Sequence, residues 1–229
     1  MAKPMFDADA LIAMFESATA RQGEQLRKAS SQATLAALQG RELTLKNIRA
    51  ALKSVAEAAS LGAARNPMAM AGSLDPETLL DQVVAGMDDA MLKAVEANRT
   101  ALGTLMAQGA DLREKHLAKA LDDLDKIEDT MFAAIRKTAA GAGAPLAGAW
   151  GAVLEKMQAG GTVSGLQASA TTEQMAQQMQ DAMRSTRAAS MRAAQALAES
   201  YTAVVSGVLM GMSEALQSSA ASGKAGRKG

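Results

Sequence analysis

The sequence predicts an all-α fold, an elongated antiparallel bundle of three long helices plus one short helix. Three features of the 229-residue chain lead to this prediction. Aromatic residues make up only 2% of the chain, although aromatic side chains supply much of the buried area in thick globular cores. The 53 Ala and 16 Met residues suit thin interfaces between helices, where small side chains let backbones approach closely. Strand-favouring residues are sparse, which argues against an α/β or all-β fold.

The first long helix is expected between residues 7 and 64, after a short lead at residues 1–6. Asp7 or Asp9 can cap its start, because a carboxylate accepts hydrogen bonds from the free N–H groups there. Apolar residues spaced three and four apart form a seam typical of a left-handed coiled coil or bundle, although Arg41 interrupts it. The seam consists of Leu38, Leu45, Ile48, Leu52, Val55, Ala59 and Gly62.

The second long helix is expected between residues 75 and 139. Arg65-Asn66-Pro67 ends the first helix, and Asp75-Pro76-Glu77 is a strong start signal, with Asp as the cap and Pro at the first helical position. Acid–base pairs four residues apart, such as Asp122–Lys126, are expected on its outer face. Two helices of similar length joined by a short loop predict an antiparallel hairpin over residues 7–139.

Residues 140–170 are expected to be a Gly/Ala-rich linker with one short helix, Pro145–Ala159, which contains the only Trp and ends at Gly160-Gly161. The last long helix is expected at residues 171–217, packed on the hairpin, with a Thr171–Gln174 capping box at its start. Residues 218–229 are small, polar and mildly basic, which predicts a disordered tail.

The sequence indicates no catalytic, cofactor-binding or metal site. His116 is the only histidine and has no carboxylate three or four residues away, whereas a helical di-metal site needs Glu-x-x-His pairs. The acidic cluster from Asp122 to Asp129 lacks the glycine that a calcium loop needs at its sixth position. It is interpreted as a solvated helix face, with weak attraction of cations or of a basic partner as the alternative. We therefore expect a protein that is not an enzyme.

Two further patterns leave a choice between core packing and outside contact. Gly207 and Gly211 form a GxxxG unit in the most apolar part of the last helix, and such spacing lets two helices cross closely. The unit serves a tight helix crossing in the core, or it exposes a flat apolar face. The methionines either fill the core or contact a changeable surface, because Met is flexible and polarizable.

The net charge, the cysteine content and the hydropathy of the chain limit its expected partners and location. The formal net charge is zero, which argues against a specific nucleic-acid partner. The absence of Cys fits a reducing compartment. No secretory signal and no apolar run of transmembrane length are found in the sequence. We therefore expect a cytoplasmic protein without a transmembrane span.

In its composition and helix pattern, the chain resembles the phasins, which coat polyhydroxyalkanoate storage granules in bacteria. The resemblance rests on Ala-rich, almost aromatic-free helices with segments such as Glu57-Ala-Ala-Ser-Leu61 and Ala193-Ala-Gln-Ala-Leu197, and on the tail Ser222-Gly-Lys-Ala-Gly-Arg-Lys228. It implies a helical, often self-associating coat protein at the boundary between granule and cytoplasm. The first two expected helices are more regular, and more like a coiled coil, than a phasin spread on a surface requires.

Under this hypothesis, apolar stripes displace water from the polymer surface, with a gain of about 25 cal/mol per Å² buried. The predicted contact residues are Leu146, Trp150, Val153 and Leu154, followed by Val204, Val205, Val208 and Leu209. One alternative is a soluble coiled-coil scaffold or adaptor that buries its stripes in a homo-oligomer or against a partner helix. Another is a membrane-active helical protein in which residues 139–165 insert as a tongue.

Overall fold

A computed structural model describes residues 6–39, 43–107, 114–185, 201 and 204–213. All regular structure in these ranges is helical, so the prediction of an all-α protein is confirmed. The prediction of three long helices plus one short helix is wrong. Within the described part of residues 6–185, eight α-helices of nine or more residues take their place, together with one short α-helix and one 3₁₀ turn.

The region expected to be the first long helix is folded back on itself. It contains α1 (Ala8–Glu16), the 3₁₀ turn η1 (Ala20–Gln22), α2 (Gly23–Leu38) and α3 (Leu45–Arg65), and both α1 and α2 pack against α3. The breaks occur at hydroxyl residues that compete with the helix for backbone hydrogen bonds. Asp7 caps α1 as expected, and the Ser17 hydroxyl donates back to the Ala13 carbonyl at 2.8 Å where α1 ends. Thr19 restarts the chain through a capping box with Gln22, and Thr44 caps α3.

The second expected helix is also divided. After α4 (Pro67–Met70) come α5 (Pro76–Ala107), α6 (Glu114–Asp125) and α7 (Ile127–Gly141). The start at Asp75 is confirmed, since its Oδ1 accepts from the Glu77 N–H at 3.0 Å. Lys126 leaves the helical conformation, with φ −90° and ψ 5°, and separates α6 from α7.

The short helix predicted around Trp150 exists as α8 (Ala144–Gly160), followed by α9 (Val163–Ser185). Gly161 ends α8 with φ +69°, a left-handed conformation that favours glycine. The predicted helix start at Thr171 is wrong, because Thr171 lies buried within α9. Two carboxylates from other helices start α9 earlier: Asp88 accepts from the Val163 and Ser164 N–H groups, and Glu128 accepts from the Thr162 N–H.

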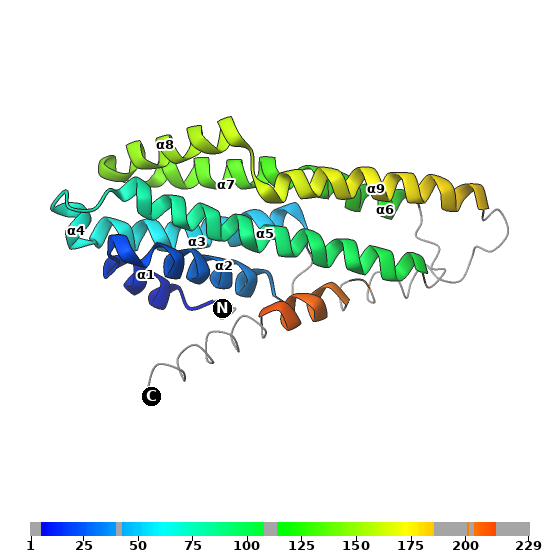
Figure 1. The fold of residues 1–229 in the computed structure, drawn as a ribbon, viewed down its shortest axis with the longest axis horizontal. Coiled ribbons are helices and arrows are strands. Elements are labelled where there is room, and N and C mark those ends of the chain that lie inside the picture. The colour runs from blue at the N-terminus through cyan, green and yellow to red at the C-terminus, as the bar shows by residue number, and fades with distance from the viewer. Residues whose placement is uncertain (1–5, 40–42, 108–113, 186–200, 202–203, 214–229) are drawn as a thin grey trace.

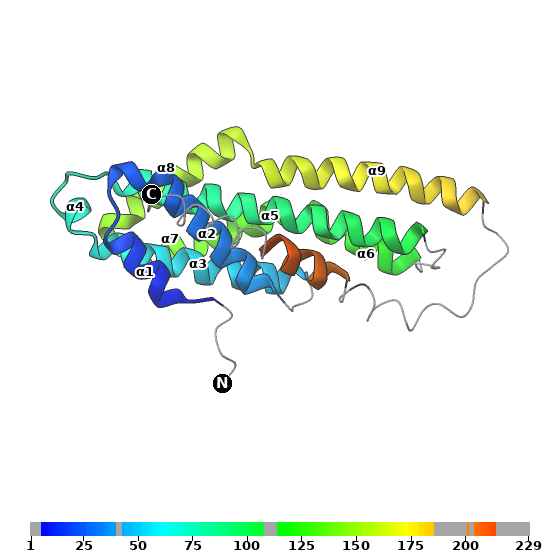
Figure 2. The same cartoon turned by 60° about the horizontal axis from the view of Figure 1, so that its bottom comes forward.

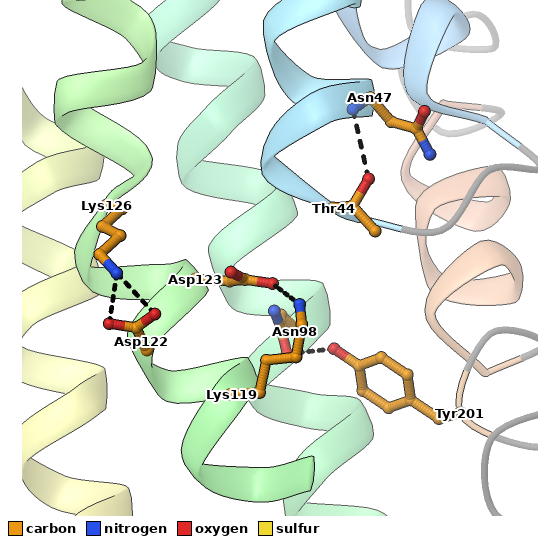
Figure 3. Close-up of polar contacts among 8 residues, drawn as sticks. All are labelled: Thr44, Asn47, Asn98, Lys119, Asp122, Asp123, Lys126 and Tyr201. Atoms are coloured by element: carbon orange, nitrogen blue, oxygen red, sulfur yellow. Dashed lines mark hydrogen bonds and ion pairs between the residues drawn. The ribbon is translucent and has the colours of Figure 1, made fainter. Parts of the chain in front are cut away.

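The chain is described again at Tyr201 and as a helix at residues 204–213. The Tyr201 hydroxyl donates to Asn98 Oδ1 of α5 at 2.5 Å, so this segment is tied to the middle of the bundle (Figure 3). Figure 3 also shows the Asp122–Lys126 pair that the sequence predicts. Residues 1–5 of the lead, residues 186–200, 202–203 and 214–217 of the last expected helix, and the tail at 218–229 lie outside the described residues.

The helices form an elongated bundle around α5, which packs against α2, α3, α8 and α9 (Figure 1). At one end lie α1 to α4 with α7 and α8, and at the other end α5, α6 and α9 extend further (Figures 1 and 2). Helices approach most closely at two glycines. A Cβ at Gly62 would lie 2.6 Å from the Phe15 Cβ, and one at Gly86 would lie 2.8 Å from the Ser30 Cβ. The core therefore relies on backbone proximity as well as on large side chains.

Candidate functional site

The first group of predicted contact residues lies on α8 and faces the interior. Leu146, Trp150 and Val153 are buried, and Leu154 is half-buried. The Trp150 indole Nε1 donates to Ser60 Oγ of α3 at 3.0 Å, and the Ser60 hydroxyl donates in turn to the Ala56 carbonyl. Buried indole N–H groups usually have such a partner. Contact with an outside surface through these side chains therefore requires α8 to leave the bundle.

The second group lies on the helix at residues 204–213. Val205 and Leu209 are buried, while Val204 and Val208 are half-buried and pack against the core. Gly207 and Gly211 do not act as a helix crossing in the described part of the chain. Both are exposed, and a Cβ at either position would meet no heavy atom within 4 Å.

Three carboxylates of the acidic cluster make contacts within the chain. Asp122 pairs with Lys126, Asp123 pairs with Lys119, and Glu128 accepts from Thr162. Among the described residues, no group of three or more His, Asp or Glu side chains could hold a metal ion. The side chain of His116 lies outside the described residues.

Charged side chains on α5 hold neighbouring helices. Arg27 of α2 donates two hydrogen bonds to Asp89, at 2.6 and 2.7 Å, and this pairing raises the pKa of the guanidinium. Lys156 of α8 lies between Glu77 and Asp81, and hydrogen bonds to these two carboxylates raise the pKa of the ammonium group. These exposed pairs orient helices, and each contributes little to stability because water screens it.

The exposed apolar side chains gather mainly at one end of the bundle. Across the described residues, seven large hydrophobic side chains are exposed, and four of them belong to α1, the last turns of α3 and α4, which lie at one end of the bundle (Figure 1). We call these four the methionine tip: Met14, Leu61, Met68 and Met70. Met70 is the most exposed, at 76%, and no helix in the described residues is both long and apolar enough to cross a bilayer.

Asn66 fixes the geometry of the methionine tip. Its side chain is fully buried, and Nδ2 donates to the carbonyls of Phe15 and Ala18 at 2.8 and 2.9 Å. Its Oδ1 accepts from the Met68 and Ala69 N–H groups and so caps α4. One amide therefore joins the end of α1 to the start of α4. The methionines project from a backbone that is held in place, while their side chains stay flexible.

The sequence pattern does not predict this arrangement, because only a short loop is expected between the two long helices. The signal was nevertheless present. Asn66-Pro67 has the same cap-then-proline form as Asp75-Pro76, and both mark a helix start.

A smaller exposed apolar pair lies at the start of α9. Val163 and Leu166 are 59% and 70% exposed and lie three residues apart, on one side of the helix. The carboxylates of Asp88 and Glu128 hold this end of α9 in place.

The comparison with known protein families places the chain in a family of unknown function, DUF6781, to which it belongs. The family model matches residues 1–218 and so includes every described helix. No curated protein and no solved structure matches the chain. The function is therefore inferred from the chain's own residues.

Proposed function

We propose that this DUF6781 protein is a non-catalytic helical interaction protein that coats or stabilises an apolar surface, such as a polyhydroxyalkanoate granule, in the manner of the phasins. The observation that carries the proposal is the methionine tip: exposed, flexible apolar side chains on a backbone anchored by the buried Asn66.

Met side chains suit a disordered polymer surface because they adapt to irregular contours. An anchored backbone favours the same contact, because little conformational entropy of the chain is lost on binding. A polymer surface offers no fixed pocket or hydrogen-bond pattern, so it demands adaptable apolar contact rather than shape complementarity. The methionine tip supplies that kind of contact.

Binding through the tip leaves the bundle closed, whereas binding through Trp150 and its neighbours opens it. The two modes differ in an observable way, because Trp150 is the only Trp and is completely buried. Tip binding leaves the indole emission unchanged, while release of α8 breaks the bond to Ser60 and shifts the emission. We favour tip binding because it needs no core residue to be exposed first.

The test is flotation of the purified protein with polyhydroxybutyrate particles. The variant Met68→Gln/Met70→Gln replaces two exposed tip side chains and leaves the buried core untouched. The expected loss is about 2 kcal/mol of apolar contact, roughly a 30-fold weaker partition onto the particles. The matched control is Met210→Gln, the same change at a side chain that is 44% exposed on the helix at residues 204–213.

Wild-type partition by the tip variant would contradict the proposal, as would equal losses in the tip and control variants. A dye on a single introduced cysteine adds a local readout, because the chain has no native Cys. Met70→Cys is expected to report an apolar environment on the particles, and Gln158→Cys, exposed on α8, is expected to remain in water.

A scaffold acting through self-association is the second candidate, and the pair Val163 and Leu166 favours it. Two exposed apolar residues three apart on one helix are typical of helix–helix contact between copies. In sedimentation equilibrium, Leu166→Gln would then shift the oligomer toward monomer, while Met68→Gln/Met70→Gln would not.

A further inference from the structure

An open groove separate from the methionine tip lies between the first half of α3 and the second half of α7. Its volume is about 290 Å³. Its lining consists of Leu45, Lys46, Arg49, Ala50, Lys53, Ala134 and Lys137.

The rim of this groove is strongly cationic. Lys46, Arg49 and Lys137 are exposed, and in the described residues none of them has a carboxylate within 4 Å. Lys53 is paired with Glu57 at the margin, at 3.2 Å. Among the described residues, four cations thus line one groove, and only Lys53 is paired with a carboxylate. An anion in the groove would be attracted by all four cations, most strongly where it displaces the water that screens these exposed charges.

The position of the groove on α3 adds to this field. The groove lies along the first turns of the helix, where the free N–H groups carry partial positive charge. Acidic residues usually occupy that position, but the first turn of α3 has none and contains Lys46. The helix end and the side chains therefore act in the same direction, toward a negative ligand.

We call the apolar part of the lining the floor of the groove; it consists of Leu45, Ala50 and Ala134. A small inorganic anion would leave this floor exposed to water. A nucleic acid would gain the phosphate contacts, but no aromatic side chain lines the groove to stack a base. A concave site of this volume accepts one small molecule rather than the flat face of a bilayer.

We propose that the groove binds a single amphiphilic anion. Its phosphate or carboxylate group is held by Lys46, Arg49, Lys53 and Lys137, and its apolar chain lies along the floor. This binding site is independent of the surface contact proposed for the methionine tip.

The experiment measures binding of monomeric decyl phosphate to the full chain by isothermal titration calorimetry. Decyl glucoside supplies the same chain without charge, and inorganic phosphate supplies the charge without the chain. Decyl phosphate is expected to bind at least ten times more tightly than either. Equal binding of decyl glucoside or of inorganic phosphate would overturn the proposal, and so would no measurable binding of decyl phosphate.

The site is located with a matched pair of variants at Ala50, an exposed residue on the floor. Ala50→Glu places a carboxylate among the four cations, whereas Ala50→Gln has nearly the same shape without the charge. Ala50→Glu is expected to weaken decyl phosphate binding at least tenfold relative to Ala50→Gln. Equal affinities in the two variants would place the ligand elsewhere and refute the assignment.

A second pair of variants tests the cationic rim and controls for charge in general. Arg49→Gln/Lys137→Gln is expected to weaken binding at least tenfold, while Arg65→Gln/Arg99→Gln, at exposed cations outside the groove, is expected to leave it unchanged. Equal losses would show an unspecific charge effect and overturn the site. Displacement of decyl phosphate by a lower concentration of a single-stranded oligonucleotide, or binding to anionic vesicles without binding of the monomer, would also overturn it.

Discussion

Replacement of Asn66 tests the anchoring of the methionine tip most directly, because one buried amide makes all four of the relevant hydrogen bonds. Asn66→Ala removes the cap of α4, at a cost of about 1 kcal/mol. It also leaves the carbonyls of Phe15 and Ala18 without the Asn66 amide as a donor. Each of these carbonyls that stays buried and unpaired costs about 1 kcal/mol. The free energy of unfolding is therefore expected to fall by about 2–3 kcal/mol.

Asn66→Asp separates the acceptor role of the side chain from its donor role. The remaining oxygen still caps α4, but the second oxygen now faces two carbonyl oxygens instead of donating to them. Burial and this repulsion raise the pKa of the introduced carboxyl above its unfolded value of about 3.9. Folding therefore favours the protonated form, and the deficit in stability is largest at neutral pH and shrinks as the pH falls toward 4.

Urea unfolding followed by far-UV circular dichroism measures both effects. Ser73→Ala, an exposed change in the same loop, is the control and is expected within about 0.5 kcal/mol of wild type. A loss below 1 kcal/mol for Asn66→Ala would refute this account of the anchor. So would an Asn66→Asp variant whose deficit does not depend on pH.

Two further predictions concern the packing of the core. Gly86→Ala is expected to lower the free energy of unfolding by about 1–3 kcal/mol, because the added Cβ would lie 2.8 Å from the Ser30 Cβ. Gly103→Ala in the same helix is expected to raise it by up to about 1 kcal/mol, because no heavy atom lies within 4 Å of the added Cβ. Thermal unfolding checks the pair, and effects of the same sign would contradict the helix crossing. Trp150→Phe and Ser60→Ala are each expected to cost about 1–2 kcal/mol, and a double-mutant cycle should show a coupling near that of one buried hydrogen bond. Strict additivity in the cycle would show that the bond contributes nothing.

Helix starts were predictable from the sequence where a cap and its helix stand next to each other. Asp7 and Asp75 cap helices as expected, and Gly161 ends α8. The chain reversals were not predictable from periodicity, because the apolar pattern continues across them. Leu38 ends α2 and Leu45 starts α3, yet their spacing of seven residues fits one unbroken coiled-coil seam. Thr19 and Thr44 cap the helices that follow these breaks, but the sequence analysis relied on the continuous seam and did not consider these caps.

The exposure of the apolar face of a helix depends on how many other helices pack around it. The sequence pattern of that one helix does not give this number. In a bundle of three long helices, the side of α8 that carries Trp150 and Val153 could have faced outward. In the observed bundle, α8 packs against α5 and α7, and Trp150 reaches Ser60 of α3. The sequence therefore identified apolar positions correctly and could not assign them to the surface or to the core.

The two proposed binding surfaces both include residues of α3, the groove together with α7 and the methionine tip together with α1 and α4. The groove uses the first half of α3, between Leu45 and Lys53, and the methionine tip begins at Leu61, roughly 12 Å further along the axis. Between them α3 is a regular helix, and its end is fixed to α1 at Gly62 and, through Asn66, to α4. Within the described residues, α3 therefore has no break between the groove and the tip through which a bound ligand could move the tip. The groove attracts by charge and the tip by adaptable apolar contact, so loss of either interaction leaves the physical basis of the other intact.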